Sequence, residues 1–194
     1  MKVKTKELTL TALLTALAII IPMVMPVKIV MPPFTATLAS HTPLILAMFL
    51  SPLAAILTAL GSAIGFFFTF TPIVAARAAT HVFFTLAGAY MIRKKFHAGW
   101  IVAITLVLHS ITDMLTVFIA AEFLGMEALL NSHAMGYVQA WLGIGTAVHH
   151  LVDFFIAYLI MIPLAKAKIM NPDLLNSFVF IKGGKKNETV GSHK

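Results

Sequence analysis

The chain has 194 residues, of which 60% are hydrophobic and only 11% charged, a balance that excludes an ordinary soluble globular protein. The net charge is +7, and the basic residues lie mostly in short flanks beside apolar segments. This position favours an anionic membrane surface over nucleic acid as their partner. Cysteine is absent, so disulfide bonds, thiolate metal sites and thiol chemistry are excluded.

Long apolar runs recur along the chain, at roughly the 20 residues that a helix needs to cross a hydrocarbon core about 30 Å thick. They predict an all-α integral membrane bundle of six transmembrane helices. The first run lacks a small-residue cleavage site followed by a hydrophilic domain, so we expect it to be retained and not removed as a signal peptide. The expected helices cover residues 7–25, 37–50, 52–70, 72–92, 98–122 and 139–165.

The basic residues decide whether the second and third apolar runs are one helix or two. Lysines precede the first helix, "RKK" at 93–95 follows the fourth, and further lysines follow the sixth. The positive-inside rule places all three groups in the cytoplasm, which requires an even number of crossings between each group and the next. We therefore expect Ser51-Pro52 to be a turn between two helices, and both termini to be cytoplasmic.

This arrangement divides the chain into a membrane domain and a tail. Residues 1–168 form the expected six-helix transmembrane domain, with long outer loops at 26–39 and 124–139. Residues 169–194 form a cytoplasmic tail whose polar end, "GGKKNETVGSHK", is expected to be disordered.

Three of the expected helices each carry two ionisable residues four positions apart, which places both on one face. Counted at about 1.5 Å per residue, all of them lie in the outer half of the membrane or near its middle. Ionisable groups in hydrocarbon are costly, and one shared pocket open to the outside would satisfy them together. The pairs are Arg77 with His81, His109 with Asp113, and His149 with Asp153, while His41 and His150 are weaker candidates.

Two interpretations of these polar residues remain open. They either hold the bundle together through hydrogen bonds and ion pairs between helices, or they bind a cargo. Arg77 favours binding because a planar guanidinium captures a carboxylate through two parallel hydrogen bonds, although aspartates on neighbouring helices could also neutralise it. A His/Asp metal site is chemically possible, but the permanent charge of Arg77 would repel the ion, so we expect no metal.

Motifs of enzymatic chemistry are missing from the sequence. "HHLVD" at 149–153 lacks the glutamate of the HExxH zinc helix, and neither GxSxG nor GxxxxGK[ST] occurs. We therefore expect a membrane protein that is not an enzyme and uses no cofactor.

Small side chains repeat at four-residue spacing in the first helix, at Ala12 and Ala16. Such a strip allows two helices to approach closely, and it either packs inside the bundle or docks on a separate membrane subunit. The chain, with six helices, a long first outer loop and an outward polar pocket, resembles the substrate-binding S-components of energy-coupling factor (ECF) vitamin transporters. In that family the AxxxA face contacts a transmembrane T-component driven by two ATPase subunits, and the resemblance assigns this contact to Ala12 and Ala16.

Two stretches, "TLASHTPLILAMFLSPLAAILTALGSAIGF" and "RAATHVFFTLAGAY", are similar to the niacin-type S-components. S-components for nickel and cobalt begin with a metal-binding Met-His, whereas this chain begins "MKVKT". The resemblance implies a subunit of the bacterial cytoplasmic membrane that captures a vitamin, expected to be nicotinate, and does no chemistry.

Nicotinate has a carboxylate at one end of its ring and a nitrogen at the other, and each needs a different kind of partner. Arg77 would hold the carboxylate with help from His81, and one of the two His/Asp pairs would meet the ring nitrogen. An aromatic side chain would stack on the ring. The residues expected to bind the vitamin are thus Arg77, His81, His109, Asp113, His149, Asp153, Tyr137 and Trp141.

Two alternatives remain. One is a free-standing, proton-coupled secondary transporter of a small organic anion, in which the His/Asp pairs relay protons. Its weakness is the small size of the chain and the lack of visible inverted repeats. The other is an S-component for a different vitamin.

Overall fold

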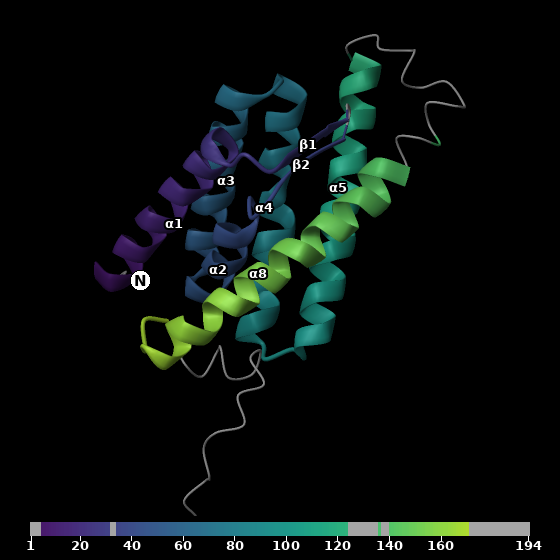
Figure 1. The fold of residues 1–194 in the computed structure, drawn as a ribbon. Coiled ribbons are helices and arrows are strands. Elements are labelled where there is room, and N and C mark those ends of the chain that lie inside the picture. The colour runs from purple at the N-terminus through teal and green to yellow at the C-terminus, as the bar shows by residue number, and fades with distance from the viewer. Residues whose placement is uncertain (1–4, 32–33, 124–135, 137–139, 171–194) are drawn as a thin grey trace, which may run out of the picture.

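The computed structural model describes residues 5–31, 34–123, 136 and 140–170, and these residues form a helical bundle with a short hairpin at one end (Figure 1). Among them, five helical stretches are long and apolar enough to cross a membrane. Large apolar side chains point outward along these helices, where lipid would cover them. The five stretches are α1 (Thr5–Val24), α3 (Pro52–Thr69), α4 (Pro72–Arg93), α5 (Ala98–Phe123) and Ala140–Lys166, which joins the π-helical η1 (Ala140–Gly145) to α8 (Thr146–Lys166).

The second expected helix is where the structure corrects the sequence analysis. A helix was expected over 37–50, but α2 (Thr42–Leu50) has only nine residues, fewer than the roughly 20 that a crossing needs. Its first eight residues are buried among the other helices. The expected bundle of six helices is therefore confirmed in part: the described residues form six helices, of which five are long enough to span a membrane and α2 is too short to cross alone.

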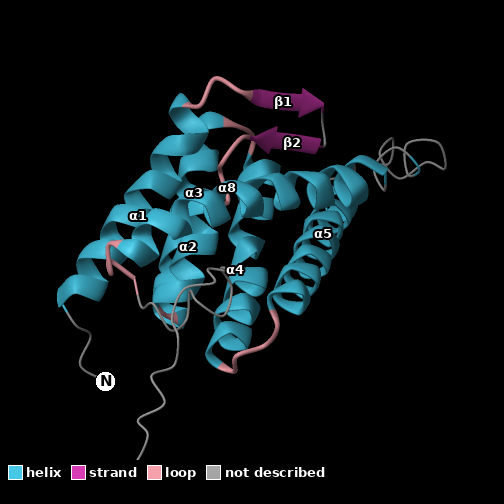
Figure 2. Cartoon of the chain, turned by 60° about the horizontal axis from the view of Figure 1, so that its bottom comes forward, coloured by secondary structure: helices cyan, strands magenta, loops and turns pink. Residues whose placement is uncertain are grey.

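The all-α fold class is confirmed, and the outer loop expected at 26–39 adds one short pair of antiparallel strands to it. β1 (Lys28–Met31) pairs with β2 (Phe34–Thr37), with Lys28 opposite Thr37 and Met31 opposite Phe34. Phe34 is buried against Val117 of α5 and Leu142 of η1. Figure 2 shows the hairpin lying over one end of the helical bundle.

The turn expected at Ser51-Pro52 is confirmed. Ser51 has extended backbone, and its hydroxyl oxygen accepts a hydrogen bond from the Ala54 amide at 3.1 Å, so it ends α2 and caps α3. Arg93, at the end of α4, donates to the carbonyl oxygens of Met48 and Leu50 at 3.1 and 2.9 Å. These bonds satisfy carbonyl groups that the end of a helix leaves without partners.

The two ends of the described bundle lie close together. Lys6, in the first turn of α1, donates from Nζ to the carbonyl oxygen of Lys168 at 2.9 Å. The basic end of α4 lies at the same end of the bundle (Figure 1). The three basic groups therefore share one side, and the cytoplasmic placement of that side stays a prediction. Residues 171–194, most of the expected tail, lie outside the described residues.

Close packing of α1 on α3 depends on two glycines. A Cβ atom added to Gly61 would lie 2.7 Å from the Thr15 Cγ2 atom, and one added to Gly65 would collide with the backbone of Ile19. Ala12 and Ala16 lie elsewhere on α1, on its exposed surface. The small-residue strip of α1 is therefore not used for packing within the described chain.

Candidate functional site

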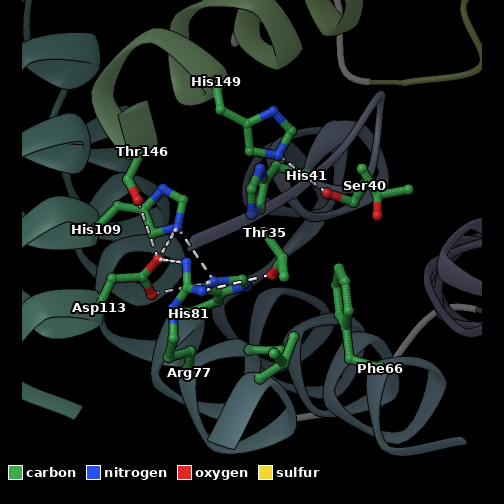
Figure 3. Close-up of a pocket in the computed structure, with 13 residues that line it drawn as sticks. Thr35, Ser40, His41, Phe66, Arg77, His81, His109, Asp113, Thr146 and His149 are labelled. Atoms are coloured by element: carbon green, nitrogen blue, oxygen red, sulfur yellow. Dashed lines mark hydrogen bonds and ion pairs between the residues drawn. The ribbon is translucent and has the colours of Figure 1, made fainter. Parts of the chain in front are cut away.

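A small polar cavity lies beneath the hairpin, between α3, α4, α5 and α8 (Figure 3). Its volume is about 20 Å³, which is space for about one water molecule and not for an aromatic ring. Its wall is mostly polar, which is unusual for the interior of a membrane bundle. The residues that line it are Thr35, Thr37, Ser40, His41, Phe66, Val74, Arg77, Ala78, His81, His109, Asp113, Thr146 and His149.

A buried ion pair forms one wall of the cavity. The Arg77 Nη2 atom lies 2.6 Å from Asp113 Oδ2, and both side chains are almost fully buried. Thr146 donates to the same carboxylate oxygen at 3.3 Å, and Arg77 Nη1 lies 3.5 Å from the Thr35 hydroxyl. The hairpin, α4, α5 and α8 therefore meet at this pair.

The second carboxylate has different partners. Asp153 accepts hydrogen bonds from the backbone amides of Ala39 and His41, at 2.7 and 2.8 Å. Ala39 has a φ of 63°, a left-handed conformation that is uncommon for alanine, and the carboxylate holds this turn in place. Asp153 thus fixes the turn that precedes α2, whereas Asp113 pairs with Arg77.

Histidines fill the middle of the site. The ring centroid of His41 lies 4.7 Å from that of His81, 4.6 Å from that of His109 and 4.7 Å from that of His149. The Nε2 atoms of His81 and His109 are 3.1 Å apart, and His150 contacts His109 from behind, Nδ1 to Nδ1, also at 3.1 Å. His41 is therefore the centre of the cluster, although the sequence analysis ranked it as a weaker candidate.

The other expected vitamin-binding residues are placed as follows. Arg77, His81, His109, Asp113 and His149 all line the cavity, and Asp153 lies against His41, with His41 Nδ1 3.0 Å from Asp153 Oδ2. Trp141 does not line it, and Tyr137 lies outside the described residues.

Trp141 faces a second, apolar pocket between the hairpin and the start of α8. This pocket has a volume of about 470 Å³, and Trp141 lies in its wall with its ring centroid 6.0 Å from that of Phe34. His149 lines both this pocket and the polar cavity. The hairpin therefore covers the polar cavity and borders a roomier apolar space beside it.

Comparison with known proteins gives one informative relative. The chain is 35% identical over 178 residues to the niacin transporter NiaX of Lactococcus lactis subsp. cremoris (strain MG1363), and the match covers 80% of this chain and 73% of that relative. No protein-family model and no solved structure matches the chain.

Proposed function

This chain belongs to the niacin-type S-components of ECF transporters, multi-pass proteins of the cell membrane, and from that premise we propose that its own cargo is nicotinate. The subunit captures the vitamin at the outer face. It delivers the vitamin inward together with a T-component and two ATPase subunits.

The observation that carries this proposal is the buried guanidinium of Arg77 in the wall of a polar cavity. A guanidinium offers five N–H donors in a planar fork, and its hydrogen bonds to a carboxylate are about twice as strong as those between neutral groups. Asp113 holds the fork in place from α5 at 2.6 Å. Arg77 is thereby oriented to receive the carboxylate of the vitamin, and His81, one turn further along α4, assists.

The ring of nicotinate lies among the histidines in this proposal. His109 and His149 line the cavity from α5 and α8, on the side toward which the ring nitrogen would point. A ring that reaches past His149 approaches Trp141 across the wall shared with the apolar pocket. Trp141 and Tyr137 are the aromatic residues that we propose to stack on it.

Binding requires the hairpin to move. The cavity in the described conformation admits about one water molecule, and Thr35 and Thr37 of β2 form part of its cover. We infer that residues 26–39 open to admit the vitamin and close over it. Phe34, packed against α5 and η1, holds the closed position.

A reconstitution experiment tests the transport role. Purified chain in liposomes is expected to bind external nicotinate but not to accumulate it, and accumulation should require the T-component, the ATPase subunits and ATP. Sustained concentrative uptake by the chain alone, driven by a pH gradient, would instead identify a proton-coupled secondary transporter.

A competition assay on the same liposomes tests the cargo. Excess unlabelled nicotinate should displace radiolabelled nicotinate, while biotin, riboflavin and thiamine should not. Displacement by another vitamin at lower concentration would show that nicotinate is not the cargo.

A further inference from the structure

Three buried histidines from different parts of the chain present ring nitrogens to one point in the cavity. They are His41 from the turn before α2, His81 from α4 and His109 from α5 (Figure 3). One ring nitrogen from each lies within 4.8 Å of those of the other two, and all three side chains are buried. Nitrogens gathered in this way surround a space in which an ion about 2.0–2.1 Å from each could sit after small side-chain adjustments.

The hydrogen-bond network leaves His109 with a lone pair that faces this space. Thr105 donates its hydroxyl proton to the carbonyl oxygen of Ile101 at 2.7 Å, so its oxygen accepts from His150 Nε2 at 3.2 Å. His150 Nδ1 then carries no proton and accepts from His109 Nδ1 at 3.1 Å. His109 Nε2, at the other end of the ring, is left without a proton and accepts from His81 Nε2 at 3.1 Å, a hydrogen bond that an ion between the two nitrogens would replace.

His41 is held in a similar way from outside the cluster. Its Nδ1 atom lies 3.0 Å from Asp153 Oδ2, the oxygen that also accepts the His41 amide. Histidines that ligate metals commonly have a carboxylate or another acceptor beside the second ring nitrogen, which orients the ring and makes it a better ligand. Asp153 and His150 occupy these supporting positions for His41 and His109.

Several buried polar atoms of the same site lack a hydrogen bond. Within the described residues they include His81 Nδ1, Thr37 Oγ1 and Asp113 Oδ1, the last of which lies 3.7 Å from His81 Nε2. They also include His41 Nδ1, which lies 3.0 Å from Asp153 Oδ2 without hydrogen-bond geometry. Buried polar groups are nearly always paired, so unpaired ones beside a cavity point to a ligand that the chain does not itself supply.

From these observations we propose that His41, His81 and His109 bind a divalent transition-metal ion of the Zn²⁺ type. The ion keeps one coordination position open, and, on the proposed function above, the ring nitrogen of nicotinate fills it while Arg77 holds the carboxylate. A pyridine nitrogen is an acceptor without a proton, as is His109 Nε2, and a metal ion can bind both.

Charge supports an ion at this place. The sequence analysis expected Arg77 to repel a metal, but Asp113 pairs with Arg77 at 2.6 Å and offsets its charge. Asp153 then leaves one negative charge beside His41, and the nicotinate carboxylate brings a second. A divalent cation balances these two charges, so the ion and the vitamin should each strengthen the binding of the other by the same factor.

Metal titration tests the site on the 194-residue chain purified in detergent and stripped with a chelator. Co²⁺ is added while visible absorption is followed, and Zn²⁺ binding is measured by calorimetry. We expect saturable binding that the His41→Ala and His109→Gln variants weaken at least tenfold. His97→Ala is the matched control, because His97 is exposed in the connection between α4 and α5 and should bind as the unchanged chain does. Folding of each variant is checked by its melting temperature and gel-filtration profile.

Ligand titrations on the stripped and Zn²⁺-loaded chain complete the test. Loading should tighten nicotinate binding at least tenfold and leave benzoate, which has the carboxylate but no ring nitrogen, unchanged. Equal nicotinate affinity in both states, with no ion binding that depends on His41, would overturn the inference and leave the proposed function standing. Ion binding that depends on His41, without nicotinate binding in either state, would support the ion site and refute the proposed function.

Discussion

Arg77 and Asp113 form an ion pair whose two members have different consequences when they are removed. A charge left alone in a buried site is strongly destabilising, whereas replacement of both charges by neutral groups of similar size is often tolerated. The pair therefore allows the structural role of Arg77 to be separated from its proposed role in binding.

We predict that Arg77→Met lowers stability by about 3–5 kcal/mol, because it leaves the Asp113 carboxylate buried without its cation. The double variant R77M/D113N should recover most of this loss. Melting temperatures in detergent measure both, and Lys94→Met, which removes an exposed cation at the opposite end of α4, serves as the control and should leave the melting temperature unchanged. A double variant as unstable as the single one would contradict this account of the pair.

The Asp153 carboxylate accepts backbone amides of the turn before α2, so its removal should disturb that turn. In Asp153→Asn, the remaining side-chain oxygen can accept only one of the Ala39 and His41 amides, because the NH₂ group that replaces the other oxygen cannot accept a hydrogen bond. We expect a loss of about 1–3 kcal/mol in stability, the cost of one buried unsatisfied polar group, together with weaker nicotinate binding because His41 loses its position. Unchanged melting temperature and unchanged calorimetric affinity would refute this role.

The hairpin is the element that controls access to the cavity in this account. Phe34 is its main anchor, since it is 3% exposed and packs on Val117 and Leu142. We predict that Phe34→Ala speeds the dissociation of bound nicotinate several-fold, measured by stopped-flow chase with unlabelled vitamin. Val30, 54% exposed on β1, supplies the control variant Val30→Ala, which should leave the rate unchanged. Equal rates for both variants would show that the hairpin is not the lid.

The contact between α1 and α3 depends on the absence of a side chain at Gly65. A Cβ atom there would meet the backbone of Ile19, which cannot rotate away, so Gly65→Ala should destabilise the bundle by about 1–3 kcal/mol. Gly136→Ala is the matched control, because no atom of the described residues lies within 4 Å of its added Cβ atom. Thermal melting in detergent distinguishes the two, and equal melting temperatures would contradict the packing described here.

At the scale of the whole molecule, the exposed strip of α1 is where we propose that the T-component docks. Ala12 and Ala16 are exposed, while Gly61 and Gly65 of α3 pack on Thr15 and Ile19. We predict that Ala12→Leu with Ala16→Leu leaves nicotinate affinity intact and abolishes uptake by the reconstituted complex. Ala103→Leu, also exposed but on α5, should transport normally. Normal uptake by the Ala12/Ala16 variant would place the interface elsewhere.

The sequence predicted the parts of the fold that depend on local apolar runs. Hydropathy and charge predicted the five long helical stretches and the Ser51 turn. The four-residue spacing predicted one shared cavity, which is lined by Arg77, His81, His109 and Asp113. The start of α2 at Thr42 was missed, although residues 37–41 are only partly apolar and Pro43 in its first turn is typical of a helix start.

The turn that precedes the start of α2 at Thr42 is held by a contact between residues far apart in the sequence. The amides of Ala39 and His41 bind Asp153, which lies more than one hundred residues away in the sequence. For the same reason the central position of His41 was missed: it carries no spacing signal, and only the fold brings it to the other histidines. Its place beside a proline-containing helix start was the one local hint.

The central claim is that Arg77 is kept in the membrane to bind the carboxylate of nicotinate. A calorimetric titration of nicotinate and nicotinamide into the unchanged chain and the folded R77M/D113N variant tests it most directly. We predict that the unchanged chain prefers nicotinate, and that the variant loses about 10- to 100-fold in nicotinate affinity, as the loss of a hydrogen bond to a charged group implies, while nicotinamide affinity changes little. Equal nicotinate affinity in the two proteins would show that Arg77 only braces the helices.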